Sequence, residues 1–127
     1  METEASGSSY NRGDWTMIFV FGSNLAGRHG KGAALTAKMK HGAIQGRGWG
    51  PQGHSWAIPT KDENLKTLPL SRIEPYVRQF IADARNHPET DFQVTRIGCG
   101  LAGYNDIDIA PMFKDAPDNC LLPNNWR

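Results

Sequence analysis

The chain has 127 residues, a hydrophobic content of 39% and a formal net charge of +1. This length and composition are typical of one soluble globular domain, which we place at residues 15–127. No apolar run approaches the length that a membrane-spanning helix requires. Two cysteines are too few for the disulfide framework of a small secreted protein. We therefore expect a cytoplasmic protein with no membrane partner.

Residues 1–14 are polar and rich in serine, and they lack the apolar segment of a secretory signal. We expect this N-terminal tail to be disordered. The four histidines show no metal-ligand spacing with Cys99 and Cys120. The sequence therefore predicts neither a metal site nor a bound cofactor.

Strands and helices are expected to alternate along the chain. The segments predicted as strands are apolar or rich in β-forming residues: 16–21, 54–59, 92–97 and 120–122. The segments predicted as helices are 31–41, 71–87 and 107–114. This alternation predicts an α/β fold in which helices flank a mostly parallel or mixed sheet.

Two predicted helices carry further signals. The first contains small residues suited to close packing on a sheet, and it ends before Gly42. The second opens with Ser71 and Glu74 at the spacing of a capping box. Between them, residues 46–53 are predicted to form a glycine-rich loop. Trp49 in this loop either stacks on a base or ribose, or is a partly buried loop aromatic.

The segment Phe21–Ala34 connects the first strand to the first helix. It contains four glycines, one carboxamide, three basic or imidazole side chains and no acid. Glycine lets the backbone approach a ligand closely, and a helix N-terminus attracts anions. We interpret this segment as a cradle for phosphate. The alternative is a flexible loop that is basic without binding a ligand.

The charge is distributed unevenly along the chain. From Gly22 to Lys61 there are six Lys or Arg residues, nine glycines and no Asp or Glu. This asymmetry indicates an anionic ligand more clearly than the net charge does. Direct binding of nucleic acid through Lys38, Arg47 and Trp49 is a further hypothesis.

Three informative loops each follow a predicted strand, at 22–32, 60–64 and 98–108. The carboxyl ends of parallel strands lie at one rim, where α/β proteins bind ligands. Lys61 in the second loop either serves the ligand, as a phosphate-binding charge or a nucleophile, or pairs with Asp62 or Glu63 at the surface.

The third loop begins with the glycine-rich turn Ile97–Tyr104, whose amides are suited to a diphosphate or ribose. Cys99 is either a nucleophile or, as we prefer, a packed thiol. Asp106 and Asp108 follow. One of them is a candidate N-cap for the next helix, and Asp106 is also a candidate acid for proton transfer or for orienting water.

Four short motifs, in their order along the chain, resemble those of macrodomains. They are Asn24, Gly30–Leu35, Pro59–Lys61 and Ile97–Gly103. The nearest resemblance is to macrodomains that remove ADP-ribose from DNA in bacterial toxin–antitoxin pairs, followed by the terminal-ADP-ribose glycohydrolase macrodomains of eukaryotes. From about residue 17 to the C-terminus, the chain also resembles small phage-encoded macro-like proteins described only as non-structural.

The resemblance implies a shortened three-layer α/β/α fold and a ligand of the ADP-ribose type. It implies that Lys61 attacks the anomeric carbon of the distal ribose, that Asp106 assists or resolves the reaction, and that Asn24 hydrogen-bonds this ribose. The ligand-binding residues that it implies lie in two loops: Gly22, Asn24, Gly30, Lys31, Gly32, Ala33, Gly98, Cys99, Gly100, Leu101, Ala102, Gly103 and Tyr104.

Two functions are compatible with this resemblance. The first is hydrolysis of ADP-ribosyl linkages on DNA or protein, with a modified nucleic acid as one potential substrate. The second is binding of ADP-ribose or an NAD-derived nucleotide signal without turnover, as in phage counter-defence. A phage-encoded protein of either kind would act in the cytoplasm of the host.

Overall fold

The computed structural model describes residues 17–127, which form an α/β fold around a five-stranded sheet. The strands lie in the order β2-β3-β1-β4-β5, and all neighbours are parallel except β2, which runs antiparallel to β3. Their bounds are Ile18–Asn24 (β1), Gly50–Gln52 (β2), Ser55–Lys61 (β3), Phe92–Val94 (β4) and Cys120–Leu121 (β5). The predicted α/β class is confirmed, and the sheet is mixed.

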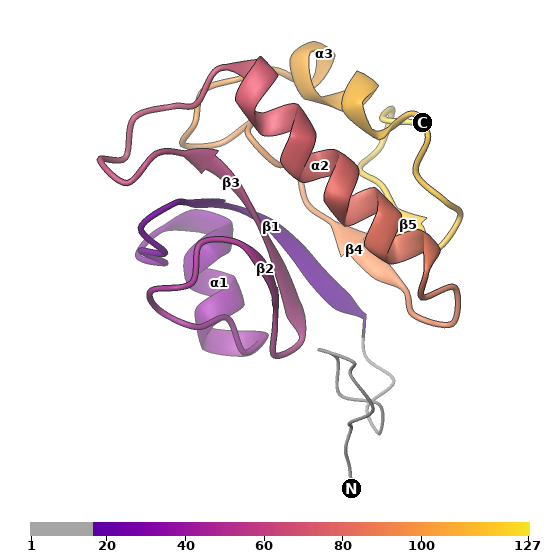
Figure 1. Cartoon of the computed structure of the whole chain (residues 1–127), viewed down its shortest axis with the longest axis horizontal. Coiled ribbons are helices and arrows are strands. Elements are labelled where there is room, and N and C mark those ends of the chain that lie inside the picture. The colour runs from indigo at the N-terminus through magenta and orange to yellow at the C-terminus, as the bar shows by residue number, and fades with distance from the viewer. Residues whose placement is uncertain (1–16) are drawn as a thin grey trace, which may run out of the picture.

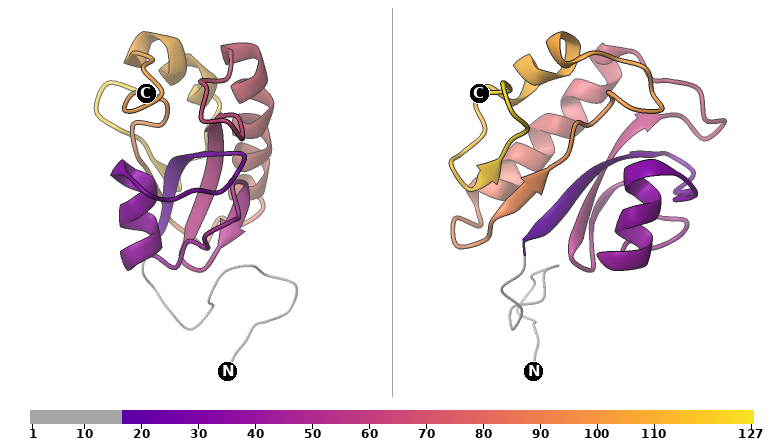
Figure 2. Two further views of the ribbon diagram at one scale, coloured as in Figure 1. Left: turned by 90° about the vertical axis from the view of Figure 1, so that its left-hand side faces the viewer. Right: turned by 180° about the vertical axis from the view of Figure 1, so that it is seen from behind.

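Helices cover both faces of this sheet (Figures 1 and 2). α1 (Gly32–Lys40) packs on one face, and α2 (Leu70–Arg85) packs on the other. α3 (Asp106–Ile109) continues directly into the 3₁₀ helix η1 (Ala110–Phe113), which contacts α2. The central strands are therefore covered from both sides.

β1 is buried along its length because its side chains alternate between two cores. On the α1 side, Phe19 and Phe21 pack in one cluster with Ala34 and Ala37. The small residues of the predicted first helix thus lie where close packing on the sheet requires them. Alternate residues such as Val20 belong to the larger core under α2.

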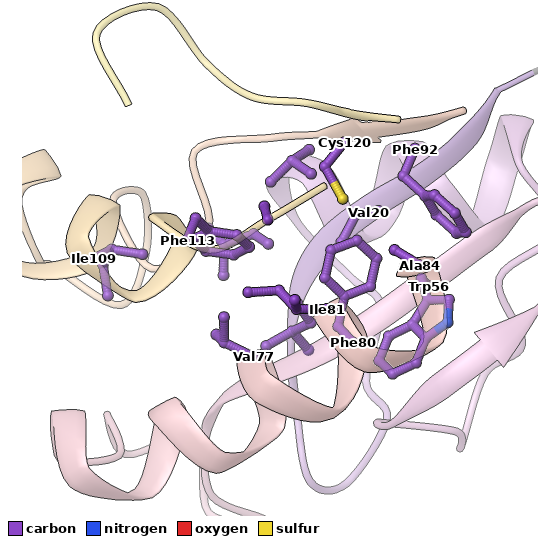
Figure 3. Packing of buried hydrophobic residues seen from close by; sticks show 14 of the residues in the cluster. Val20, Trp56, Val77, Phe80, Ile81, Ala84, Phe92, Ile109, Phe113 and Cys120 are labelled. Carbon is purple, nitrogen blue, oxygen red and sulfur yellow. The ribbon is translucent and has the colours of Figure 1, made fainter. Parts of the chain in front are cut away.

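The larger core joins α2 to the sheet and to η1. Figure 3 shows Val77 and Phe80 of α2 among apolar side chains of the strands and of the C-terminal segment. The ring of Phe80 meets those of Trp56 and Phe92 edge to face, at centroid distances of 5.2 and 5.4 Å. α2 therefore buries one apolar face, whose residues are Ile73, Val77, Phe80, Ile81 and Ala84.

The first strand extends farther than the sequence predicts. Residues 16–21 are the expected strand, whereas β1 continues through Asn24. β3 likewise runs to Lys61, beyond its expected end, and Lys61 pairs with Asn24. The two central strands thus supply each other with backbone partners that the local sequence does not reveal. Residue 16, at the expected start of the first strand, lies outside the described residues.

Pro59 lies inside β3, where the sequence predicts the end of the strand. Proline has no N–H to donate to a neighbouring strand. The register between β1 and β3 shifts directly after the pair Ser23–Pro59, so that Asn24 is opposite Lys61. This irregularity accommodates the proline without ending the strand.

Two further strands differ from the prediction. Part of the expected loop 46–53 forms β2, because its backbone pairs with β3 along the edge of the sheet. The strand expected over 92–97 ends at Val94. Both the N–H and the hydroxyl of Thr95 donate to the carbonyl of Val20, at 3.1 and 2.8 Å. The chain then leaves the sheet for the turn that follows.

The capping box predicted for the second helix is wrong. α2 begins at Leu70 with Pro69 as its N-cap, and no side chain caps this end. Ser71 is therefore already inside the helix, where it cannot act as the N-cap. Glu74 instead accepts a hydrogen bond from Arg78 at 3.0 Å, one turn farther along.

The N-cap of the last helix is also a different residue from the predicted one. Asn105 occupies this position, instead of Asp106 or Asp108. Asp108 is the third residue of the helix. Its carboxylate accepts the N–H of Asn105 at 3.0 Å, which is a common contact at this position of a capped helix. Asp106 is thus the first residue of α3, and its carboxylate is available for other contacts.

The predicted disordered tail, residues 1–14, lies outside the described residues, so the domain boundary at residue 15 stays a prediction. Within residues 17–127, no helix combines the length and the apolar character needed to span a bilayer.

Candidate functional site

A cavity of about 670 Å³ lies at the carboxyl ends of β1, β3 and β4. Cavities of this size commonly hold small-molecule ligands, and this edge is where α/β sheets bind them. The lining residues come from the β1–α1 segment, from the end of β3 and the turn after it, and from the turn after β4. They are Gly22, Ser23, Asn24, Arg28, Gly30, Lys31, Gly32, Ala33, Ala34, Thr60, Lys61, Leu65, Thr95, Arg96, Ile97, Gly98, Gly100, Leu101 and Ala102.

The charged side chains around the cavity are all cationic. They are Arg28, Lys31, Lys61 and Arg96, and the lining residues that the structure describes include no Asp or Glu. Low-dielectric walls that carry one sign of charge attract ligands of the opposite sign. The cavity is therefore electrostatically suited to an anion.

The N-terminus of α1 forms part of the cavity wall. Lys31 is its N-cap residue, no side chain caps this end, and the first turn contains no acid. Gly32, Ala33 and Ala34 of this first turn line the cavity. The first N–H groups of a helix have no acceptor within the helix and carry partial positive charge. An anion in the cavity would meet these groups.

The glycines of this region serve two different purposes. A Cβ on Gly27 would lie 2.3 Å from the backbone of Gly46, so glycine is required there for packing between two loops. Gly30 and Gly100 both line the cavity, neither has a left-handed φ, and a Cβ on either would meet nothing within 4 Å. Contacts within residues 17–127 therefore do not explain these two glycines, whereas close approach of a ligand would.

The side chain of Asn24 closes its own loop. Its Nδ2 donates to the carbonyl of Arg28, and its Oδ1 accepts from the N–H of Arg28, both at 2.9 Å. Asn24 lines the cavity, although only 8% of its surface is exposed. The amide keeps one N–H and one lone pair beyond these two bonds. Its contact with a distal ribose stays a prediction.

His29 stands in the same segment but outside the cavity wall. It is fully buried, its Nε2 lies 3.0 Å from the carbonyl of Arg47, and its ring meets Phe21 edge to face. Because a carbonyl only accepts, Nε2 carries the proton and donates. The imidazole thus holds the 46–48 loop against β1.

Lys61 is the last residue of β3, and its half-buried side chain lines the cavity. The sequence leaves open whether it pairs with Asp62 or Glu63. Oδ1 of Asp62 accepts the N–H groups of Asn64 and Lys66, at 2.8 and 2.9 Å, and so stabilises the turn after β3. Lys61 forms no ion pair with any carboxylate of the described residues. This leaves its ammonium group for a ligand.

Asp106 does not line the cavity, but it binds a residue that does. Its carboxylate accepts hydrogen bonds from Nε and Nη2 of Arg96, at 3.0 and 3.2 Å. It also accepts from Nε1 of Trp126 at 2.8 Å and from the thiol of Cys99 at 3.7 Å. The carboxylate expected to act in catalysis is therefore engaged by three side chains.

These contacts shift the pKa values of the groups involved. Hydrogen bonds from Arg96, and then from Trp126, hold the pKa of Asp106 below its usual value. Burial, followed by the charge of Asp106, raises the pKa of Cys99. A raised pKa makes the nucleophilic thiolate scarcer. The partly buried Cys99 therefore favours the thiol form, as the packed-thiol alternative expects.

Tyr104 closes the turn after β4 from outside the cavity. Its hydroxyl donates to the carbonyl of Leu68 at 2.7 Å, and its N–H donates to the carbonyl of Gly98 at 2.8 Å. The hydroxyl of Thr67 donates to the carbonyl of Ala102 at 2.9 Å. The turn after β3 and the turn after β4 are thus tied together beside the cavity.

Most of the residues predicted for the site do line one cavity. They are Gly22, Asn24, Gly30, Lys31, Gly32, Ala33, Lys61, Gly98, Gly100, Leu101 and Ala102. The predicted residues that do not line it are Cys99, Gly103, Tyr104 and Asp106.

Arg96 and Leu65 line the cavity without a role assigned from the sequence. Arg96 could have been predicted from the sequence, because it is a cation two residues before Gly98, at the start of a glycine-rich turn expected to bind the ligand. Leu65 gives no such signal, because it is an apolar residue in an irregular connector. Only its place in the folded turn reveals it.

Trp49 does not line the cavity. Its ring packs edge to face on Trp56 and lies tilted against Tyr76, at centroid distances of 4.7 and 4.9 Å. It is therefore the partly buried loop aromatic of the two alternatives. Among residues 17–127, no group of three or more His, Cys, Asp or Glu residues is arranged to hold a metal ion.

Comparisons with protein-family models, with curated proteins and with solved structures find no match to this chain.

Proposed function

We propose that the cavity binds ADP-ribose or an ADP-ribose-derived ligand, with the diphosphate beside the N-terminus of α1. The observation that carries this proposal is the cavity itself, where four cations and an uncapped helix end meet without an acid. Phosphate oxygens are well matched by helix N–H groups and by Arg and Lys. The resemblance of the loop motifs to macrodomains supplies the identity of the nucleotide.

The two unexplained glycines provide a test that separates binding from folding. We expect Gly30→Ala and Gly100→Ala to weaken ADP-ribose binding about tenfold, because each methyl group occupies space that the ligand needs. Both variants should be as stable as wild type, or more stable by about 0.5 kcal/mol, because alanine restricts the unfolded chain. Calorimetric titration and denaturant unfolding measure the two effects.

Gly27→Ala is the control for this experiment. Its methyl group would collide with the backbone of Gly46, so this variant should lose stability. Equal ADP-ribose affinity in wild type, Gly30→Ala and Gly100→Ala would contradict the proposed placement of the ligand.

For activity, we propose that Lys61 attacks the anomeric carbon of the distal ribose. Once the ammonium group has released a proton to water, the nitrogen lone pair forms the new C–N bond while the glycosidic bond breaks, and the electron pair of that bond departs with the leaving group. The amine gives up a proton, and the leaving group takes one up. Water then hydrolyses the C–N bond, which releases ADP-ribose and restores the lysine.

This activity predicts a specific pattern of kinetics. Lys61→Ala should reduce release of ADP-ribose from modified DNA or protein by at least about a hundredfold, as removal of a nucleophile does. Lys66 is the matched control, because it is exposed in the same turn and does not line the cavity. Lys66→Ala should retain wild-type rates. If wild type turns over neither substrate, the catalytic proposal fails for both.

A second candidate function is binding without turnover. It is favoured by a specific observation, namely that the described cavity residues include no carboxylate and that Asp106 is engaged outside the wall. The cavity then has no acid to move a proton during cleavage. Chromatography of the ligand after calorimetry separates the candidates, since intact ligand indicates a binder and altered ligand indicates an enzyme.

A further inference from the structure

Arg96 lies in the turn after β4, and Asp106, which lies outside the cavity wall, binds its side chain. Resting on the proposed function, we infer that Arg96 binds a phosphate group of the ligand and that Asp106 is the positioning residue that fixes its guanidinium. Asp106 then acts on the ligand through Arg96 and does not touch it.

The geometry of the pair leaves one edge of the guanidinium for a ligand. Asp106 occupies the edge formed by Nε and Nη2, with one carboxylate oxygen on each nitrogen. The edge formed by Nη1 and Nη2 has no acceptor among residues 17–127. A guanidinium edge binds two oxygens of one phosphate side by side. Arg96 lines the cavity, and we infer that this second edge meets an anion there.

Asp106 is itself anchored to the protein core. Nε1 of Trp126 donates to Oδ1 of Asp106, the same oxygen that accepts from Nε of Arg96. Trp126 is 4% exposed, and its ring packs on Phe113 at a centroid distance of 5.5 Å. A continuous series of contacts therefore runs from the core, through Trp126 and Asp106, to Arg96 at the cavity wall.

Fold stability does not account for the Arg96–Asp106 ion pair. The side chains of Arg96 and Asp106 are 60% and 49% exposed, and ion pairs at such positions add little to stability. Positioning the Arg96 side chain before the ligand binds would favour binding. A long side chain that is already held loses less conformational freedom when the ligand binds.

Electrostatics and positioning predict opposite results for Asp106→Asn. Removing a negative charge beside a cationic cavity strengthens anion binding if charge alone matters. Asparagine still offers an oxygen to Trp126 and to Nε of Arg96, but its NH₂ group is a donor, so it cannot accept from Nη2 and removes one of the two bonds that fix the guanidinium. If positioning matters, the variant binds a phosphate ligand more weakly although its net charge is more positive.

The experiment is a calorimetric titration of the full chain with ADP-ribose and, separately, with inorganic pyrophosphate. We expect Asp106→Asn to bind both about threefold to tenfold more weakly, which is the cost of ordering one long side chain. Arg96→Gln should bind at least about tenfold more weakly, with a shallower salt dependence. Trp126→Phe keeps the apolar ring but lacks the donor, and should weaken binding about twofold.

Two controls show that the effect passes through Arg96. Glu74 forms a comparable exposed pair with Arg78, at 3.0 Å on α2, and does not line the cavity. Glu74→Gln makes the same change in net charge and should leave affinity unchanged. In a chain that already carries Arg96→Gln, adding Asp106→Asn should cause no further loss of affinity, because the two residues act as one unit. Thermal unfolding verifies that each variant folds.

The outcomes are distinguishable. Equal or tighter binding by Asp106→Asn overturns the positioning role, and undiminished binding by Arg96→Gln overturns the phosphate contact. If wild type binds pyrophosphate but not ADP-ribose, the proposed function fails while the same variants still test Arg96. If wild type binds neither probe, both inferences fall.

Discussion

At the scale of single residues, Leu65 combines backbone strain with an exposed apolar side chain. Its φ is 65°, and 42% of its surface is exposed at the cavity wall. The left-handed region costs a residue with a Cβ about 1–2 kcal/mol. Leu65 lies in the turn after β3, where its N–H donates to the carbonyl of Asp62 at 3.0 Å. Glycine or asparagine would serve the turn better, so we expect the leucine to serve the ligand.

Leu65→Gly should therefore separate stability from binding. Relief of the strain should leave the free energy of unfolding unchanged or raise it by about 1 kcal/mol, after the greater flexibility of glycine is subtracted. ADP-ribose affinity should fall about fivefold, since part of a leucine side chain no longer becomes buried against the ligand. Leu121→Ala, at an exposed leucine outside the cavity wall, is the control. Unchanged affinity in Leu65→Gly would show that the rim leucine does not contact the ligand.

At the scale of secondary-structure elements, α2 contains a proline that disfavours the helix. Pro75 lies within the helix, beyond its first turn, and is exposed. Proline removes one backbone hydrogen bond and crowds the preceding turn, at a cost of about 3 kcal/mol in a helix interior. α2 nevertheless forms, because residues on its other side, such as Val77 and Phe80, are buried in the larger core.

Pro75→Ala should stabilise the protein. We expect the free energy of unfolding to rise by about 1–2 kcal/mol, because the restored hydrogen bond outweighs the restriction that proline places on the unfolded chain. Denaturant unfolding measures this change. Gln79→Ala, at an exposed position of the same helix, controls for the helix propensity of alanine and should change stability by no more than about 0.5 kcal/mol. A loss of stability in Pro75→Ala would mean that the helix depends on the geometry of the proline.

At the scale of the whole molecule, the last two residues fasten the C-terminal segment to the rest. The guanidinium of Arg127 donates to the carbonyls of Ala116, Pro117 and Cys120, at 2.9 to 3.1 Å. Trp126 is buried in the larger core and holds Asp106. Trp126 and Arg127 therefore hold together three parts of the molecule: the edge strand β5, η1 and the wall of the cavity.

Trp126→Ala should consequently affect folding and binding together. We expect a loss of about 3–5 kcal/mol in the free energy of unfolding, typical of truncating a buried tryptophan, together with weaker binding of ADP-ribose. Trp126→Phe preserves most of the packing and should cost markedly less stability. Thermal unfolding and calorimetry, performed below the transition of each variant, measure the two effects. A loss below about 1 kcal/mol in Trp126→Ala would show that the C-terminus is not an anchor.

Elements whose signals are local can be read from the sequence alone. Apolar runs and helical spacing predict the strands and helices near their observed positions, because burial of a periodic face fixes the type of an element. The two glycine-rich turns follow strands and Lys61 ends one, and the parallel strands bring all three to one rim.

Other features depend on partners that are distant in the sequence, and they form only in the folded chain. β2 and the end of β1 form because β3 offers them hydrogen bonds, and Pro59 is tolerated because the register beside it shifts. Asp106 becomes a neighbour of Trp126 only after the C-terminal segment packs against the core. A sequence pattern shows which residues can bury a face or bind an anion, but a side chain's hydrogen-bond partner is set by whichever group the fold brings within reach.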